Sequence, residues 1–210
     1  LTIFHLMGQH VNYKQRYRTK QARFWASSYE DKRPELTNAQ RKMLSHYDNA
    51  TLYNDSIVAQ IVKRFQKQDA IVIYVPDHGE ECYEENRGFI CRNHSAEIDW
   101  PLAHYEFEIP FWIYCSPKYI RNHRDIYRQI RKAKDKRFMT DALPHLLLYL
   151  AGIETPTYKE EYNILSPKYD EMRPRILKNS ADYDKLRDAH LEKVKKEERK
   201  KVKKKKGDKK

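Results

Sequence analysis

The sequence lacks an apolar run of the roughly 20 residues that a membrane-spanning helix requires. Its longest apolar stretch, 143–153, is shorter and is interrupted by His145. The chain begins with Leu1 instead of Met, and no targeting segment precedes the first apolar residues. Because residues 2–7 already have the pattern of a core strand, we expect the chain to be the C-terminal part of a longer protein.

The body of the chain also lacks a large excess of positive charge, although the whole sequence carries +12. Residues 185–210 hold fourteen Lys or Arg and five Asp or Glu, so this segment supplies +9 of the total. We therefore expect no nucleic-acid partner for the folded part. Residues 185–210 are predicted to be a basic low-complexity tail that is disordered, or helical only in part. A non-catalytic module that binds polyanions through this tail stays open as an alternative function.

Cysteine is scarce, with 3 residues in the chain. Cys82 and Cys91 flank a polar loop, whereas Cys115 ends an apolar run and is expected to be a buried thiol. In an oxidising compartment a disulfide between Cys82 and Cys91 would close a short loop, and in the cytosol both would be free thiols. Zinc ligation is a third interpretation, although the spacing differs from that of a structural zinc knuckle.

The feature around which the sequence is organised is a β-branched apolar run, 71–75, followed by Pro76 and then by Asp77-His-Gly-Glu80. A short apolar run without helical period is typical of a buried parallel strand. In open α/β sheets, ligands bind just beyond the carboxyl ends of the strands. Neighbouring oxygen and nitrogen donors beside a glycine can form half of a zinc site, although such a motif also occurs in ordinary loops.

A second apolar run of this kind opens the chain, because residues 2–7 lead into Gly8-Gln9-His10. Thr37 is a favourable helix start, and apolar residues then recur at intervals of three and four until Gln68. Such a helix would cross over to strand 71–75 in a β-loop-α-β unit with parallel strands. The ligands that follow the two strands would then meet at one edge of the sheet.

The remaining segments predict one more strand, at 108–115, and helices at 117–134 and 140–152. Residues 12–33 are aromatic and basic without a clear period, which indicates a long surface loop. Long loops are often functional, so both a solvated connection and a contact with a phosphate or headgroup are open for this segment.

Several motifs follow one another in a characteristic order. They are Phe4-His-Leu-Met-Gly-Gln-His10, Tyr47-Asp-Asn-Ala-Thr-Leu-Tyr-Asn-Asp55, Tyr74-Val-Pro-Asp-His-Gly-Glu80, and Asn93-His94 ahead of Glu108-Ile-Pro-Phe-Trp-Ile113. In these motifs the chain resembles the phosphoethanolamine transferases, sulfatase-like members of the alkaline phosphatase superfamily that modify lipid A or the inner core of lipopolysaccharide. The likeness is greatest to the branch that modifies core heptose, and it extends from residue 1 to about 154.

The resemblance implies a three-layer α/β/α sandwich of the alkaline phosphatase/sulfatase type, mostly parallel and incomplete at its N-terminal side. Residues 1–154 would be the C-terminal part of the catalytic domain, 155–184 a Pro- and Tyr-rich extension, and 185–210 the basic tail. The whole protein would be anchored in the bacterial inner membrane by N-terminal helices that this chain does not include, with its catalytic domain in the periplasm.

The resemblance also implies roles for single residues and a zinc cofactor. Asp77 and His78 would be zinc ligands, His10 and His94 would hold the donor headgroup or a second zinc, and Glu80 would assist nearby. The catalytic His10 and His94 would neutralise or protonate oxygens that gain charge. The family's threonine nucleophile and a glutamate ligand lie on earlier strands that this chain lacks, so we expect the chain alone to be inactive.

The implied reaction transfers phosphoethanolamine from a phospholipid, phosphatidylethanolamine, to a phosphate or sugar of lipopolysaccharide. It would proceed through a covalent phospho-threonine. A sulfatase or phosphodiesterase-type hydrolase of the same superfamily stays open as an alternative, because the nucleophile that would separate the two is not in this chain.

Overall fold

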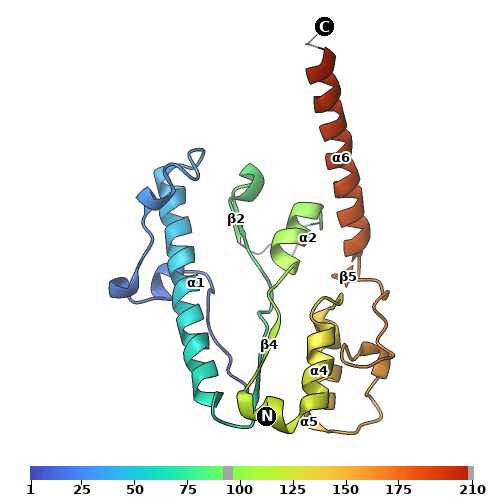
Figure 1. Cartoon of the computed structure of the whole chain (residues 1–210). Coiled ribbons are helices and arrows are strands. Elements are labelled where there is room, and N and C mark those ends of the chain that lie inside the picture. Colours follow the sequence, from blue (N-terminus) through green and yellow to red (C-terminus); the bar gives the residue numbers. More distant parts are fainter. Residues whose placement is uncertain (92–96, 208–210) are drawn as a thin grey trace. The chain divides into compact units, whose positions relative to one another are not determined.

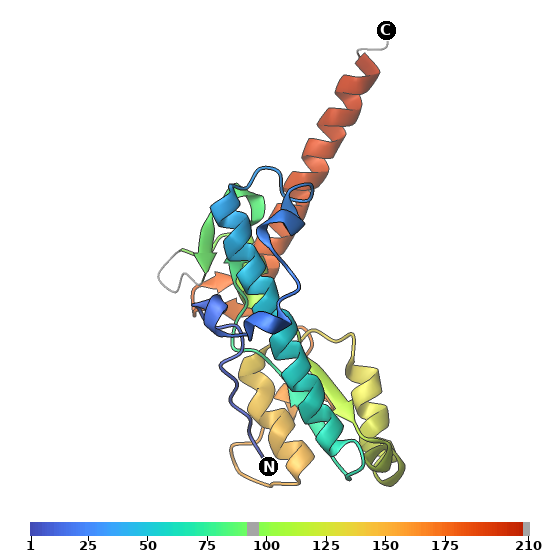
Figure 2. The same ribbon diagram turned by 90° about the vertical axis from the view of Figure 1, so that its left-hand side faces the viewer.

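The computed structural model describes residues 1–91 and 97–207, without the side chains of 86, 89–91 and 202–207 (Figures 1 and 2). The chain divides into two compact units, which are described separately below. The first unit comprises Leu1–Val75, Cys82–Cys91 and Phe111–Ile130, and the second comprises Pro76–Glu81, Arg92–Pro110 and Arg131–Lys210.

The first unit is built on the long helix α1 (Asn38–Phe65). The predicted start at Thr37 is confirmed, because Thr37 and Gln40 form a capping box in which the Gln40 N–H donates to Thr37 Oγ1 at 3.3 Å. The same box joins the Thr37 N–H to Gln40 Oε1 at 2.7 Å. These two bonds satisfy backbone donors that the first helical turn otherwise leaves unpaired.

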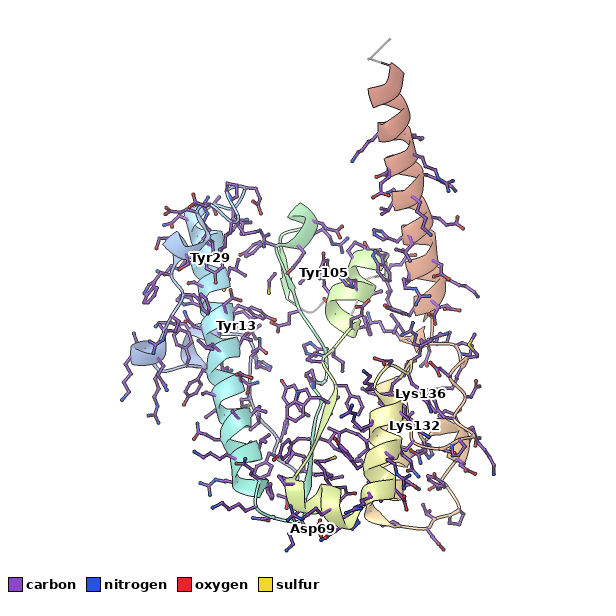
Figure 3. The ribbon with its side chains drawn as sticks, in the orientation of Figure 1. Tyr13, Tyr29, Asp69, Tyr105, Lys132 and Lys136 are labelled. Atoms are coloured by element: carbon purple, nitrogen blue, oxygen red, sulfur yellow. The ribbon has the colours of Figure 1, made fainter. Side chains whose placement is uncertain are left out.

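The aromatic segment 12–33 packs along α1 and contains three short 3-10 turns (Figure 2). The turns are η1 (Tyr13–Gln15), η2 (Thr19–Gln21) and η3 (Ala26–Tyr29). Tyr13 is buried and meets the ring of Tyr47 edge to face, with 5.3 Å between ring centroids. Figure 3 labels Tyr13 and Tyr29, which both lie against this helix. The segment is therefore held to α1 by buried tyrosines.

Strands β1 (Ile71–Tyr74) and β4 (Trp112–Cys115) pair in the first unit, with Ile71 opposite Cys115 and Tyr74 opposite Trp112. Both strands are predicted correctly. They run antiparallel, whereas we expected a mostly parallel sheet in which strand 71–75 lies parallel to residues 2–7. The rings of Tyr74 and Trp112 stack across the pair at 5.2 Å. Two short strands, β2 (Glu81–Cys82) and β3 (Phe89–Cys91), pair with each other on either side of η4 (Glu84–Asn86).

Residues 2–7 form no strand, which corrects the prediction of an opening strand. Ile3 and Met7 are 80% and 58% exposed. An apolar pattern indicates only that a segment is suited to a strand. The strand forms only when a second strand pairs with its backbone N–H and C=O groups. No strand of the described residues pairs with this segment.

The predicted helix 117–134 is present as two helices, α3 (Pro117–Asn122) and α4 (Arg124–Ala133), separated by His123. Ser116 caps α3, because its Oγ accepts from the Tyr119 N–H at 3.0 Å and donates to the Gln68 carbonyl at 2.6 Å. Asn122 also donates to Asp69, which Figure 3 labels, at 2.7 Å. These contacts join the segment between α1 and β1, which contains Gln68 and Asp69, to the residues that follow β4.

The second unit contains α2 (Trp100–Phe107), α5 (Leu143–Ala151) and the two-stranded pair of β5 (Ile176–Leu177) and β6 (Ala181–Asp182). The predicted helix at 140–152 is confirmed as a short turn, η5 (Thr140–Ala142), that leads into α5. Gly152 ends α5 with φ of 65°, a left-handed conformation that glycine adopts without strain. A further turn, η6 (Glu160–Tyr162), lies in the Pro- and Tyr-rich segment.

The last described element is a long helix, α6 (Tyr183–Gly207), where we predicted a mainly disordered tail. Its first two turns are anchored, because Tyr183 belongs to a core cluster with Leu102 and the ring of His190 stacks on Trp100 at 5.3 Å. Lys, Arg and Glu are strong helix formers, so the anchored turns continue as helix through a low-complexity sequence. Residues 191–201 are all exposed.

Among residues 1–91 and 97–207, no helix combines the length and the apolar composition that crossing a membrane requires.

Candidate metal-binding loop

Asp77 and His78 lie side by side on the loop 76–81, which follows β1 in the chain. Asp77 is 86% exposed and His78 is 21% exposed, and His78 Nε2 lies 3.6 Å from Asp77 Oδ2. His78 Nδ1 lies 2.6 Å from the Gly79 carbonyl oxygen. A carbonyl oxygen only accepts, so Nδ1 carries a hydrogen, and in the neutral imidazole, the form that binds metals, the lone pair is on Nε2. The nitrogen with the lone pair is thus the one that lies near the Asp77 carboxylate.

This arrangement suits two ligands of one zinc ion. Zinc in proteins is tetrahedral with ligand distances of about 2.0–2.2 Å, which puts two ligand atoms about 3.4 Å apart. The separation of 3.6 Å between Nε2 and Oδ2 is close to that value. A backbone carbonyl on the other ring nitrogen also orients a histidine for metal binding. No group of three or more His, Cys, Asp or Glu able to hold a metal occurs among the described residues. Asp77 and His78 are therefore a candidate pair of ligands only.

Helix α2 fixes the loop through Gly79. The Gly79 N–H donates to the Glu106 carbonyl at 2.8 Å, and a Cβ built on Gly79 would lie 2.2 Å from the Tyr105 carbonyl oxygen. Figure 3 labels Tyr105, which belongs to α2. Glycine is therefore required here by the close approach of two backbones. Helix α2 was not predicted from the sequence, although Asp99 followed by Trp100-Pro101 is a recognisable helix start. Asp99 Oδ1 accepts from the Leu102 N–H at 3.0 Å.

The other predicted site residues are placed differently. Glu80 lies half-buried on the loop 76–81, together with Asp77 and His78. His10 is exposed and belongs to the first unit, on a turn in which its N–H donates to the Met7 carbonyl at 3.0 Å and its carbonyl accepts from Arg16 Nε at 2.9 Å. His94 lies outside the described residues. The roles assigned to these residues stay predictions.

The cysteines are described in part. Cys82 is buried, and the side chain of Cys91 lies outside the described residues, so the pairing of the two stays a prediction. Cys115 is a free thiol and is half-buried, whereas we expected a buried one. Burial raises the pKa of the Cys115 thiol, which lowers its reactivity.

We expect a Cys82–Cys91 disulfide in protein isolated from an oxidising compartment. Alkylation of denatured, unreduced protein should then label Cys115 alone, and prior reduction should make all three cysteines reactive. Peptide mass spectrometry measures both results, with Cys115 as the internal control. Alkylated Cys82 and Cys91 in the unreduced sample would contradict the pairing.

The family model described as Sulfatase matches residues 1–153. The chain therefore belongs to the sulfatase family. It is 32% identical over 174 residues to phosphoethanolamine transferase EptC of Escherichia coli O18:K1:H7 (strain RS218 / NMEC), which covers 81% of this chain and 29% of that protein. It is 31% identical over 140 residues to the Kdo(2)-lipid A phosphoethanolamine 7''-transferase of Escherichia coli (strain K12), which covers 65% of this chain and 23% of that protein.

The chain is also similar to a solved structure, the C-terminal periplasmic domain of EptC from Escherichia coli in complex with Zn. The TM-score is 0.68 at 28% identity, with 87% of this chain and 51% of that chain covered. These comparisons confirm the predicted likeness to phosphoethanolamine transferases and the α/β fold of the alkaline phosphatase/sulfatase type. This chain spans less than a third of the length of both curated relatives.

Proposed function

We propose that this chain is part of an enzyme that transfers phosphoethanolamine to lipopolysaccharide. The observation that carries the proposal is the pair of donors on the loop 76–81, with the Nε2 lone pair of His78 beside the Asp77 carboxylate and the loop fixed by α2. The names of the similar proteins, and the Zn in the similar solved structure, support the same assignment.

In this proposal Asp77 and His78 hold a zinc ion. A bound zinc would polarise the phosphoester and lower the pKa of an oxygen nucleophile. His10 and His94 bind the phosphoethanolamine headgroup and place protons on oxygens that gain charge, and Glu80 supports the loop beside them. The nucleophile is a threonine that lies outside this chain. Its oxygen displaces diacylglycerol from the donor phosphate and forms a covalent phosphoethanolamine–threonine ester, which the acceptor oxygen then attacks to release the threonine. The chain alone is therefore inactive.

The proposed partners follow from the same reaction. The donor is phosphatidylethanolamine, and the acceptor is a phosphate or sugar of lipid A or of the lipopolysaccharide core. The whole protein sits in the bacterial inner membrane with this part in the periplasm. The similarity to a periplasmic domain supports that location.

The zinc assignment is tested by His78→Ala in the whole protein. We expect the variant to lose its bound zinc, with affinity lowered by at least about tenfold, because it lacks one of few ligands. Transfer of phosphoethanolamine should fall with the metal. Metal content after dialysis, measured by mass spectrometry, and a transfer assay with lipid A report the two effects.

The chain offers a matched control in His123, whose Nε2 lies 3.3 Å from Asp69 Oδ1 in a comparable histidine–aspartate pair. His123→Ala should keep its zinc and its activity. Normal zinc content in the His78→Ala variant would rule out the assignment. Release of free phosphoethanolamine without transfer by the unaltered protein would favour the hydrolase alternative.

A further inference from the structure

The first unit contains a cavity of about 380 Å³ that the proposed reaction does not use. It lies between the segment 14–27 and the first half of α1, and its volume falls in the range of small-molecule pockets. The lining residues that matter here are Lys14, Tyr17, Phe24, Trp25, Lys42 and His46.

The cavity is positively charged. Lys14 comes from η1 and Lys42 from α1, and no Asp or Glu is among the described residues that line the cavity. Burial lowers the pKa of His46, and the positive charges of Lys14 and Lys42 lower it further. Both ammonium groups therefore act on the same small volume, with no carboxylate of the lining to neutralise them. An anion is the ligand that such a volume favours.

One wall of the cavity is aromatic. Tyr17, Phe24 and Trp25 are among the lining residues, and Trp25 is 58% exposed. The Tyr17 hydroxyl and His46 Nδ1 are hydrogen-bonded at 2.9 Å, which orients both rings. Lys14 Nζ lies 5.0 Å from the centroid of the Tyr17 ring and donates to Thr19 Oγ1 at 3.3 Å. The cations and the aromatic rings are thus adjacent, which suits a ligand with a charged end and a flat apolar face.

A buried asparagine holds this wall in place. Asn49 is 2% exposed, and its Oδ1 accepts from the backbone N–H groups of Arg23 at 2.6 Å and Phe24 at 3.1 Å. Its Nδ2 donates to the Phe24 carbonyl at 2.8 Å. Three hydrogen bonds from one buried side chain fix the segment that carries Phe24 and Trp25 against α1. The wall is therefore preorganised, which reduces the ordering that binding requires.

We propose that this cavity binds a sugar phosphate, with the phosphate between Lys14 and Lys42 and the sugar ring against the aromatic wall. Charge-assisted hydrogen bonds from ammonium groups suit a phosphate monoester. An aromatic ring offers the apolar faces of a sugar a matching surface. The proposal rests on the cavity and does not depend on the transfer reaction.

Calorimetric titration of the 210-residue chain with glucose 1-phosphate tests the proposal. Glucose 1-phosphate should bind more tightly than inorganic phosphate, and glucose should not bind. The double variant Lys14→Met/Lys42→Met should weaken binding by about tenfold or more, because it removes charged donors. Trp25→Ala should weaken binding of glucose 1-phosphate and leave that of inorganic phosphate unchanged.

The matched control is Lys20→Met/Lys63→Met, which removes the same charge from lysines that do not line the cavity. This variant should bind glucose 1-phosphate like the unaltered chain, and circular dichroism should show that all variants are folded. Equal weakening in the two double variants, or no binding at millimolar concentration, would overturn the proposal. Tighter, Lys14- and Lys42-dependent binding to vesicles of phosphatidylglycerol and phosphatidylcholine would overturn it in favour of a lipid headgroup.

Discussion

Gly79→Ala is expected to lower the free energy of unfolding by about 3 kcal/mol, which is the upper part of the range for overpacked sites. The added Cβ would lie 2.2 Å from the Tyr105 carbonyl oxygen, and backbone cannot move aside as a flexible side chain can. The loop must then leave α2 and lose the hydrogen bond from the Gly79 N–H to the Glu106 carbonyl. Urea unfolding followed by circular dichroism measures the change.

Gly88→Ala is the informative control for this prediction. Gly88 has φ of +90°, and no heavy atom of the described residues lies within 4 Å of an added Cβ, so the cost of Gly88→Ala comes from backbone conformation. That cost is about 1–2 kcal/mol. The φ of Gly79 is not positive, so the loss of stability in Gly79→Ala comes from the clash alone. If Gly79→Ala were no more destabilising than Gly88→Ala, the close packing of the loop on α2 would be wrong.

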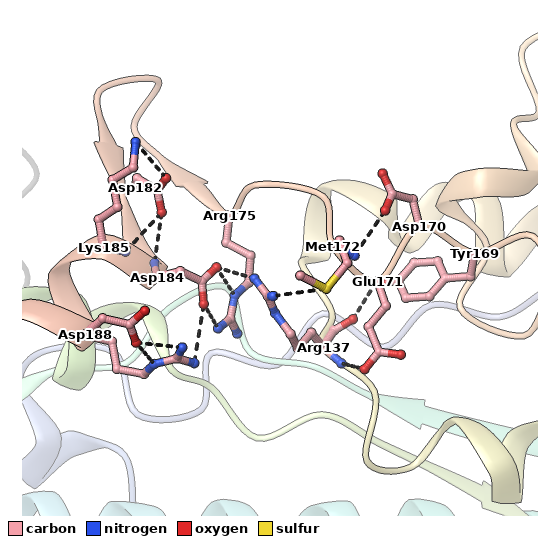
Figure 4. Close-up of polar contacts among 11 residues, drawn as sticks. Arg137, Tyr169, Asp170, Glu171, Met172, Arg175, Asp182, Asp184, Lys185 and Asp188 are labelled. Carbon is pink, nitrogen blue, oxygen red and sulfur yellow. Dashed lines mark hydrogen bonds and ion pairs between the residues drawn. The ribbon is translucent and has the colours of Figure 1, made fainter. Parts of the chain in front are cut away.

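Asp184→Ala is expected to lower the free energy of unfolding of the second unit by about 2 kcal/mol, between the values for surface and buried ion pairs, because it leaves half-buried cations without their counter-charge. The carboxylate contacts Arg137, accepts from Arg175 at 2.6 Å and lies 3.3 Å from Arg187 (Figure 4). Asp184 is 18% exposed, so water screens these pairs only in part. It also lies in the first turn of α6, where a negative charge is favourable.

Asp188 is the matched control on the same helix. It pairs with Arg187 at 2.9 Å and is 66% exposed, so Asp188→Ala should change stability by about 0.5 kcal/mol or less. Thermal unfolding and hydrogen exchange of the first turns of α6 measure both variants. Similar stability of the two variants would show that the arginine contacts of Asp184 are not worth more than a surface pair.

The contribution of Asp184 should depend on pH. Its hydrogen bond with Arg175, together with the nearby guanidinium charges, lowers the pKa of the Asp184 carboxyl. The unfolded chain therefore takes up a proton at higher pH than the folded one, and acid favours unfolding. The stabilisation is complete above the ordinary carboxyl pKa of about 3.9 and declines as the pH falls below it. The difference between the unaltered chain and the Asp184→Ala variant should shrink accordingly in acid.

Local patterns predicted the helices well. Thr37 predicts the start of α1, and Gly152 predicts the end of α5. Both signals depend only on residues that are close together in the sequence. The prediction of a mainly disordered tail was wrong because low complexity was taken as a sign of disorder. The packing of Tyr183 and His190 anchors the start of a segment that is rich in helix formers. The predicted pairing of strand 71–75 with residues 2–7 was wrong for a different reason. An apolar run does not specify which strand it pairs with or in which direction.

The sequence by itself determined the family and the chemical character of the candidate site. Asp77 and His78 supply an oxygen donor and a nitrogen donor at adjacent positions of the chain, so their proximity does not depend on folding. Only the tertiary structure decided that the Nε2 lone pair of His78 lies beside Asp77, and that α2 leaves no room for a Cβ at Gly79. It also decided that Lys14 and Lys42 line one cavity. These features join residues distant in sequence or depend on the direction of single bonds, which packing and hydrogen bonding set.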